Sequence, residues 1–240
     1  MTNAQRFIRA YNKLDAMLRS LYDADARIGF SELVRRCAAK NAVISVNEYK
    51  LIDYARLRNA IVHQGVRDEV IAQPHTDVVE ELERIAELVA SPPAAIDVLP
   101  QRPVQTVGGG VKLKEAICSI HRSGYSNLPV IRGGKLIGVL NNRLIVHTLA
   151  AAASRGESID NFCEQTNVSD ILDESRHKQY YSILPKAASV TDVLNEFNQK
   201  RKLLCVVITQ SGHRYEKPLG IITTADIIDL ARAIDDYNMD

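Results

Sequence analysis

Three polar residues near the end of one predicted helix have side chains suited to binding an anion. The helix runs from about Val46 to Gln64, and winding it at about 100° per residue places Arg58 inside its apolar face. Asn59 and His63 are four residues apart, so they stack one turn above the other at the edge of that face. The apolar face consists of Leu51, Tyr54, Ala55, Leu57, Ile61 and Val62.

Arg58 has two interpretations, because a guanidinium among core positions is costly unless an anion or a hydrogen-bonding group meets it. In the structural interpretation, Arg58 extends its charged end to water or pairs with a carboxylate such as Asp15 or Asp53. In the functional interpretation, Arg58, Asn59 and His63 together face an anion such as a phosphate.

Four amphipathic helices with short connections are expected to position these residues. Asn3 can cap a first helix that ends near Tyr22, and Ser31 can cap a second. The third is the helix above, which Gly65 is expected to end, and the fourth covers Asp77 to Ala90. Residues 1–91 therefore form a predicted bundle, and residues 92–95, which begin with two prolines, form a linker.

The segment Arg58-Asn59-Ala60-Ile61-Val62-His63, near the end of a helix in an all-helical region, resembles the HEPN superfamily. That family consists of four-helix bundles, and many members are metal-independent RNases that act as dimers. The resemblance implies that His63 assists proton transfer at the ribose 2′-hydroxyl, Arg58 stabilises charge on the scissile phosphate and Asn59 orients the pair. The chemistry suits these roles, because histidine titrates near neutral pH and arginine presents a fork that matches phosphate oxygens.

The hydrophobic period changes after the linker, and a two-copy repeat begins. Leu128 to Leu140 predicts two short buried strands around Gly133-Gly134, with helices before and after them. The same order recurs with a helix at about Val190–Lys200, strands at 203–208 and 219–223, and a helix from Ala225. Each copy is long enough to be one β-α-β-β-α unit, so the whole chain is expected to be α followed by α/β.

This repeat resembles a tandem CBS domain pair, with motif 1 at 96–156 and motif 2 at 166–234. CBS pairs typically bind adenine nucleotides of the AMP, ADP or ATP type and regulate an attached domain. In the family's Gly-x-x-Thr-x-x-Asp pattern, the hydroxyl contacts phosphate and the aspartate holds the ribose hydroxyls, which implies these roles for Thr223 and Asp226. A carboxylate can accept from two vicinal hydroxyls. Alternatively, Thr223 merely caps the last helix.

The first copy departs from this pattern, because Asn141 and Leu144 occupy the positions of the threonine and the aspartate. Leu144 cannot hold a ribose, so at most one good nucleotide cleft is expected per chain. Lys202, within the basic run that starts at Lys200, could neutralise a polyphosphate at the second site, although such a run is usually a solvated turn. Gly108-Gly109-Gly110 lacks the Lys-Ser/Thr of a phosphate loop and is interpreted as a turn.

Composition and charge narrow the function classes. The net charge of +1 argues against a generally basic nucleic-acid coat, although residues 1–67 carry a local excess of Lys and Arg over Asp and Glu. The four cysteines are widely scattered, and neither they nor the histidines have metal-ligand spacing. Free thiols used as small core residues suit a reducing cytoplasm, and no apolar run is long enough to span a membrane.

The sequence therefore predicts a nucleotide-regulated, dimeric RNA-binding protein or metal-independent endoribonuclease. In the alternative, the chain is a non-catalytic adenine-nucleotide sensor whose helical domain mediates dimerisation or partner docking. The expected partners are a second copy of the chain, an adenine nucleotide and, in the first reading, RNA. No metal or membrane is expected to take part.

Overall fold

The computed structural model describes residues 1–63, 73–100, 102–172 and 180–236. The chain divides into two compact units, which are described one at a time. The helical unit comprises Met1–Pro93, Ser189–Asn195 and Asp229–Asp240, and the sheet unit comprises Ala94–Ala188 and Glu196–Ile228.

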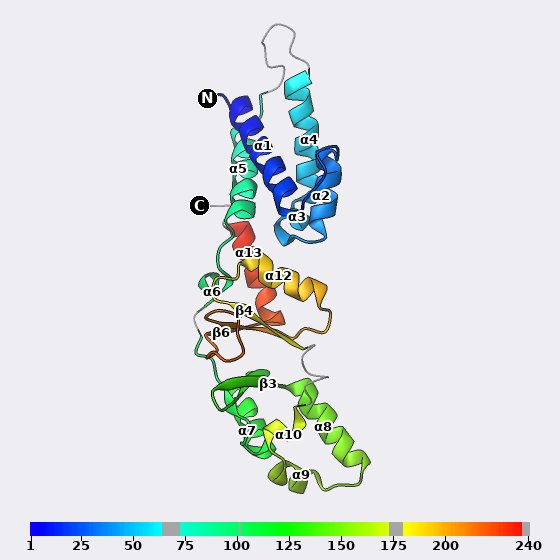
Figure 1. Ribbon diagram of the computed structural model, residues 1–240, viewed down its shortest axis with the longest axis vertical. Helices are drawn as coiled ribbons and strands as arrows, with labels where there is room; N and C mark the ends of the chain where they lie inside the picture. The colour runs from blue at the N-terminus through cyan, green and yellow to red at the C-terminus, as the bar shows by residue number, and fades with distance from the viewer. Residues whose placement is uncertain (64–72, 101, 173–179, 237–240) are drawn as a thin grey trace. The chain divides into compact units, whose positions relative to one another are not determined.

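The helical unit is built on α1 (Asn3–Leu21), α2 (Phe30–Ala38), α3 (Ala42–Val46), α4 (Glu48–His63) and α5 (Thr76–Ala90), shown in Figure 1. The first helix packs against α2, α4 and α5, and α2 packs against α3 and α4. The rings of Phe7 on α1 and Tyr54 on α4 meet edge to face, with their centroids 5.7 Å apart. The largest fully buried side chains of this unit are Phe7, Leu14, Leu18, Leu33, Ile44, Leu51, Leu82, Ile85 and Leu88.

The caps of the first two helices differ from the predicted ones. Thr2, not Asn3, caps α1, because its hydroxyl accepts from the backbone N–H of Gln5 at 3.2 Å and the Gln5 side chain accepts from Thr2 N–H at 3.0 Å. Asn3 instead donates to Pro74 O and to Thr76 Oγ1, which holds the start of α1 beside the start of α5. Ser31 lies inside α2, whose N-cap position is occupied by Gly29.

The third predicted helix is also wrong at its beginning. Val46 ends the short helix α3, and α4 starts at Glu48. Buried Asn47 separates the two helices, since its side chain donates to Val43 O at 2.9 Å and so satisfies a carbonyl at the end of α3. Val62 is 42% exposed, so the apolar face of α4 is narrower than expected. Gly65, the predicted helix end, lies outside the described residues.

The sheet unit contains two three-stranded sheets with the same connectivity. In the first, β1 (Val107–Gly108) is parallel to β2 (Asn127–Arg132), which is antiparallel to β3 (Lys135–Asn141). In the second, β4 (Tyr181–Pro185) is parallel to β5 (Cys205–Thr209), which is antiparallel to β6 (Gly220–Thr223). This duplication matches the repeat expected from the sequence.

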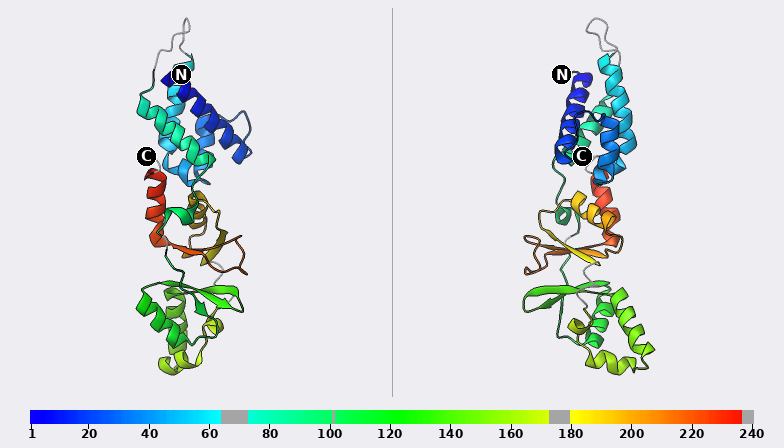
Figure 2. Two further views of the ribbon diagram at one scale, coloured as in Figure 1. Left: turned by 90° about the vertical axis from the view of Figure 1, so that its left-hand side faces the viewer. Right: turned by 45° about the vertical axis from the view of Figure 1, so that its right-hand side comes forward.

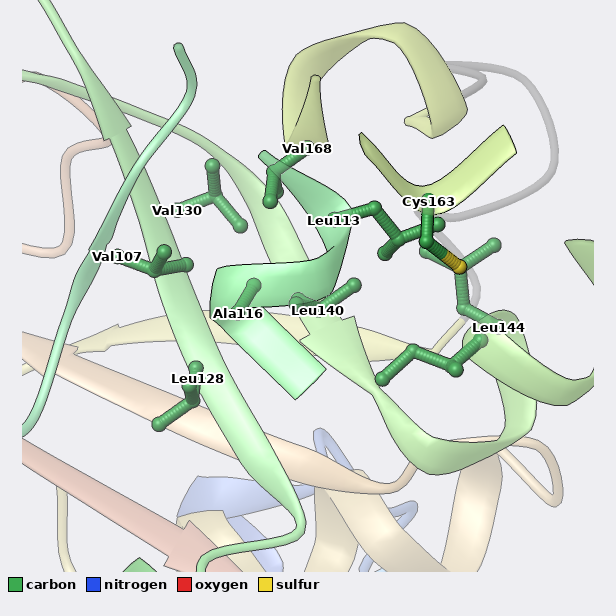
Figure 3. Close-up of a cluster of buried hydrophobic side chains, with 10 residues drawn as sticks. Val107, Leu113, Ala116, Leu128, Val130, Leu140, Leu144, Cys163 and Val168 are labelled. Carbon is green, nitrogen blue, oxygen red and sulfur yellow. The ribbon is translucent and has the colours of Figure 1, made fainter. Parts of the chain in front are cut away.

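Helices pack on the first sheet and enclose its core (Figure 3). These are α7 (Leu113–Ser123) and α8 (Asn142–Ser154), followed by α9 (Ile159–Gln165) and α10 (Val168–Ile171), which the sequence did not suggest. Cys163 on α9 and Val168 on α10 complete this core. The turn between β2 and β3 is the predicted one, with Gly133 and Gly134 at φ of 56° and 75°, in the left-handed region that favours glycine.

The two sheets of the sheet unit, seen from two further directions in Figure 2, share a second core cluster. Leu136 and Val139 of β3 pack with Tyr181, Cys205 and Val207 of the second sheet. The backbone N–H of Leu136 also donates to the carbonyl of Arg214 at 2.8 Å. Burial raises the pKa of the Cys205 thiol to about 12, so this cysteine acts as a core residue and not as a nucleophile.

The remaining described elements are α6 (Ala95–Val98), α12 (Val190–Gln199), the 3₁₀ turn η1 (Thr224–Asp226) and α13 (Ile227–Asp236). Within the described ranges, no helix has the length and apolar character needed to cross a membrane. The same ranges hold no cluster of three or more His, Cys, Asp or Glu side chains that could ligate a metal ion.

Candidate functional site

A cavity of about 230 Å³ in the sheet unit contains both residues of the predicted Thr-x-x-Asp pair. Three segments wall it: the stretch from α6 to β1, the turn between α7 and β2, and the region from β6 to η1. Its lining residues are Ile96, Leu99, Pro100, Arg102, Pro103, Gln105, Gly124, Tyr125, Ser126, Asn127, Leu219, Gly220, Ile221, Ile222, Thr223, Ala225 and Asp226.

Thr223 and Asp226 form a capping box at the start of η1. One carboxylate oxygen of Asp226, Oδ2, accepts from the backbone N–H of Thr223 and from its hydroxyl, both at 2.8 Å. Thr223 therefore plays the capping role that the sequence left open. Its hydrogen bonds fix the Asp226 carboxylate at the cavity wall.

Arg102 is the cavity residue that the sequence reasoning missed. Its Nη1 lies 3.6 Å from Asp226 Oδ1, the oxygen that the capping box leaves uncovered. The Asp226 side chain is 11% exposed and the Arg102 side chain is 59% exposed, so a nearly buried anion faces a solvent-exposed cation. The one signal in the sequence was the position of Arg102 in a proline-rich stretch after the linker. No local pattern connects Arg102 with Asp226, which is distant in the chain.

The rest of the cavity is largely apolar. Ile96 of α6 lies against β6, where a Cβ added to Gly220 would come within 3.1 Å of Ile96 Cδ1. Glycine at this position therefore allows α6 to approach the strand and close one side of the cavity. Tyr125 and Leu219 add partly exposed apolar surface to the lining. Such a wall suits a flat, weakly polar group such as a purine base.

The corresponding residues of the first copy have structural roles. Asn141 caps α8, because its Oδ1 accepts from the backbone N–H of Leu144 at 2.9 Å. Leu144 is buried in the core of the first sheet. The sequence-based expectation that Asn141 could cap a helix is confirmed, and Leu144 packs as an apolar core residue.

The basic run at 200–202 is placed apart from this cavity. Lys200 donates to Ser182 Oγ at 2.9 Å and to Glu196 Oε2 at 2.6 Å, and it lines a separate cavity that also contains Arg214. Lys202 is exposed in the turn before β5 and is not a lining residue of the Asp226 cavity. The described cationic group at the predicted nucleotide site is therefore Arg102.

In the helical unit, Arg58 lies beside Tyr11. Its Cζ is 6.0 Å from the centre of the Tyr11 ring, and Nη1 donates to Asn59 Oδ1 over a long 3.5 Å. Its Nε is buried and has no hydrogen-bond partner among the described residues. The side chain of His63 lies outside the described residues, so the predicted trio is described only for Arg58 and Asn59.

The two carboxylates suggested as partners of Arg58 pair with other arginines. Asp15 lies 2.9 Å from Arg19 Nε, and Asp53 lies 2.7 Å from Arg56 Nη1. Burial, reinforced by the Asp15 carboxylate and opposed by Arg58 and Arg19, raises the pKa of Tyr11 to about 12. Tyr11 is therefore uncharged at neutral pH and presents its ring, not a phenolate, to the Arg58 guanidinium.

Comparison with family models identifies part of the sheet unit. Residues 95–151 match the CBS domain. This CBS domain includes α6, the first sheet and α7, and it supplies Arg102 and Tyr125 to the cavity. The comparison with curated proteins found no match.

Several solved structures of CBS proteins are similar to the chain. A protein with CBS domains from Burkholderia ambifaria MC40-6 is 16% identical, with 58% of this chain and 92% of that chain covered and a TM-score of 0.44. Protein MJ1225 from Methanocaldococcus jannaschii is 17% identical, with 69% and 55% covered and a TM-score of 0.46. The CBS domain pair of protein MJ0100, solved with 5′-methylthioadenosine and S-adenosyl-L-methionine, is 18% identical, with 60% and 98% covered and a TM-score of 0.40.

Proposed function

We propose that the sheet unit binds an adenine nucleotide and acts as a ligand-sensing regulatory module. The observation that carries the proposal is the cavity, in which a nearly buried carboxylate, a guanidinium and an apolar wall are combined. A nucleotide has three matching parts: vicinal ribose hydroxyls, a phosphate and a flat base. The CBS domain at 95–151, which forms one side of this cavity, supports the same assignment.

In this proposal Asp226 accepts hydrogen bonds from the ribose hydroxyls, and the apolar residues around Ile96 enclose the base. Thr223 positions the carboxylate. The segment 166–234 is the second CBS motif of a tandem pair. The predicted contact of Lys202 with a polyphosphate tail is tested separately, by comparing the affinities for AMP and ATP.

Isothermal calorimetry with adenosine, AMP, ADP and ATP tests the proposal. Asp226→Asn keeps the size of the side chain but removes its charge, so we expect AMP to bind about tenfold more weakly or worse. Asp229→Asn is the matched control, because Asp229 is an exposed carboxylate outside the cavity lining. Equal affinities of wild type and Asp226→Asn would refute the assignment of Asp226, and a wild type that binds none of the four ligands would refute the proposed function.

A second candidate function belongs to the helical unit: RNA binding, with metal-independent cleavage by an HEPN-like site of Arg58, Asn59 and His63. The observation that favours it is the buried Arg58 Nε without a described partner, together with the pairing of Asp15 with Arg19 and of Asp53 with Arg56. A cation that no described carboxylate neutralises is available to a phosphate. The observation that favours a structural role is the contact with Tyr11. RNA binding that persists unchanged in Arg58→Ala would argue against this site.

The predicted homodimer is part of the same proposal, with the helical units meeting so that their Arg58 and His63 residues approach each other. In the alternative, the helical unit only mediates dimerisation or docks a partner. Light scattering at micromolar concentration tests the assembly. A monomeric mass would exclude both the shared RNA site and a dimerisation role.

A further inference from the structure

The hydrogen bonds at Asp226 restrict what Thr223 can offer a ligand. A hydroxyl has one proton to donate, and an ionised carboxylate only accepts. The Thr223 hydroxyl donates that proton to Asp226 Oδ2 at 2.8 Å. In this arrangement Thr223 cannot also donate to a phosphate, so a phosphate must find its hydrogen-bond donors elsewhere in the cavity.

The charges of the cavity point to one donor. Among the lining residues that the structure describes, Arg102 is the sole side chain with a positive charge and Asp226 is the sole one with a negative charge. Their separation of 3.6 Å places the guanidinium over the carboxylate oxygen that a ribose hydroxyl would use. A bound nucleoside and Arg102 therefore compete for Asp226 Oδ1.

The two partners differ in how readily they can move. Asp226 is fixed by the capping box, whereas the Arg102 side chain is 59% exposed and long enough to adopt other positions. Because the Arg102 guanidinium is solvent-exposed, water can replace its contact with Asp226, so displacing Arg102 costs little. A displaced guanidinium remains beside the cavity, where its planar fork matches two oxygens of a phosphate.

From this geometry we infer that Arg102 is a specificity-determining residue that selects ligands by charge. Without ligand it covers Asp226 Oδ1. With a nucleotide it yields that oxygen to the ribose and binds the phosphate. This inference rests on the proposed adenine-nucleotide function and specifies the ligand class as a nucleoside monophosphate.

Three ligands are expected to differ in affinity for this cavity. Adenosine displaces Arg102 without giving it a new partner. AMP displaces it and supplies one phosphate. ATP brings further negative charge into a cavity whose described lining has no second cation and retains the Asp226 carboxylate, so like-charge repulsion opposes it. The expected order of affinity is AMP, then ATP, then adenosine.

The test is calorimetry of adenosine and AMP with wild type and Arg102→Gln. We expect AMP to bind about tenfold more weakly to Arg102→Gln, because charge-assisted hydrogen bonds are lost. Adenosine should bind equally well or up to about fivefold more tightly, because the competing ion pair is gone. Arg132→Gln, which removes an exposed arginine outside the cavity lining, should change neither affinity.

Opposite or divergent responses of the two ligands support the inference, and parallel changes would overturn it because they indicate a packing role. Unchanged affinities in Arg102→Gln would also overturn it. A wild type that binds neither ligand would refute the proposed function itself. Added salt should weaken AMP binding more in wild type than in Arg102→Gln, and equal salt dependence would contradict a contact between Arg102 and phosphate.

Discussion

Arg58 of the helical unit and Arg102 of the sheet unit occupy contrasting environments. Arg58 is half-buried against Tyr11, its Nε has no described partner, and both candidate carboxylates pair with other arginines. Arg102 is largely exposed but lies beside a nearly buried carboxylate. The comparison shows that the two arginines differ in their partners as well as in their burial: Arg58 contacts an aromatic ring, and Arg102 contacts a carboxylate. We propose that a ligand can replace the partner of Arg102.

The largest expected effect is a change in the rate of RNA cleavage, which shows whether Arg58 takes part in catalysis. In an RNA cleavage assay with excess chelator, His63→Ala should lower the rate roughly 10²–10⁴-fold, the usual contribution of a proton-transfer group. Arg58→Ala should lose a comparable amount, and Arg58→Lys should recover only part of it, since an ammonium lacks the two-pronged geometry.

Arg56→Ala is the matched control for this assay, because Arg56 is an exposed arginine of the same helix that pairs with Asp53. Cleavage that survives in both Arg58→Ala and His63→Ala would indicate a different site. A wild type inactive on every RNA tested, with or without nucleotide, would contradict the nuclease hypothesis. Dimerisation or partner docking would then remain as the proposed role of the helical unit.

The cluster of buried side chains that joins the two sheets of the sheet unit gives the second prediction. Leu136 is fully buried there, so Leu136→Ala should lower the free energy of unfolding by about 2–5 kcal/mol. It should also weaken AMP binding, because the cavity walls come from both halves of the sheet unit. Chemical denaturation measures the first effect, with Val146→Ala, a change at a 65% exposed position, as the control. An unchanged AMP affinity in Leu136→Ala would show that this cluster does not affect ligand binding in the cavity.

The raised pKa of Tyr11, which lies beside Arg58, predicts a pH-dependent stability. Because the pKa of Tyr11 is raised to about 12 in the folded protein, folding retains a proton that the unfolded chain loses near pH 10. The associated stability is fully present below about pH 10 and is lost as the pH rises toward 12, by about 3 kcal/mol in total for a shift of about two pKa units. Tyr11→Phe should reduce this alkaline destabilisation in melting curves recorded across that range.

Tyr54 also contributes to the loss of stability at alkaline pH, because burial and its hydrogen bond to Glu81 raise its pKa as well. Some alkaline sensitivity should therefore remain in Tyr11→Phe. Tyr49→Phe, at a position 84% exposed, should behave like wild type. Identical alkaline melting of wild type and Tyr11→Phe would contradict the prediction.

The smallest expected effect separates a structural Arg58 from an anion-binding one. Arg58→Met should change the free energy of unfolding by less than about 1 kcal/mol, because the substitution removes a contact with an aromatic ring and no described ion pair. Thermal melting at neutral pH measures this change. A loss of several kcal/mol would mean that Arg58 has a structural partner and would favour the sensor reading of the helical unit.

The sequence by itself determined the elements whose signals are local. The Gly133-Gly134 turn, the strands around it and the repetition of the same order follow from short apolar runs, turn residues and helical periodicity, and the strand pairing agrees. The sequence also showed that the first copy has Leu144 where the second copy has Asp226. Leu144 is an apolar residue and packs in the core of the first sheet. Asp226 could be singled out as a candidate for the same reason, because the pattern that contains it is contiguous.

Only the tertiary structure decided which distant groups meet. Asn3 and Ser31 were plausible caps, but Thr2 completes a capping box and Asn3 finds partners at Pro74 and Thr76. Asn47 interrupts a helix that periodicity joined, because burial lets its side chain satisfy the end of α3. Arg102 reaches Asp226 because α6 closes against Gly220 of β6. Such contacts depend on which segments the folded core brings together. The spacing of residues along the chain does not predict which distant residues will be close in space.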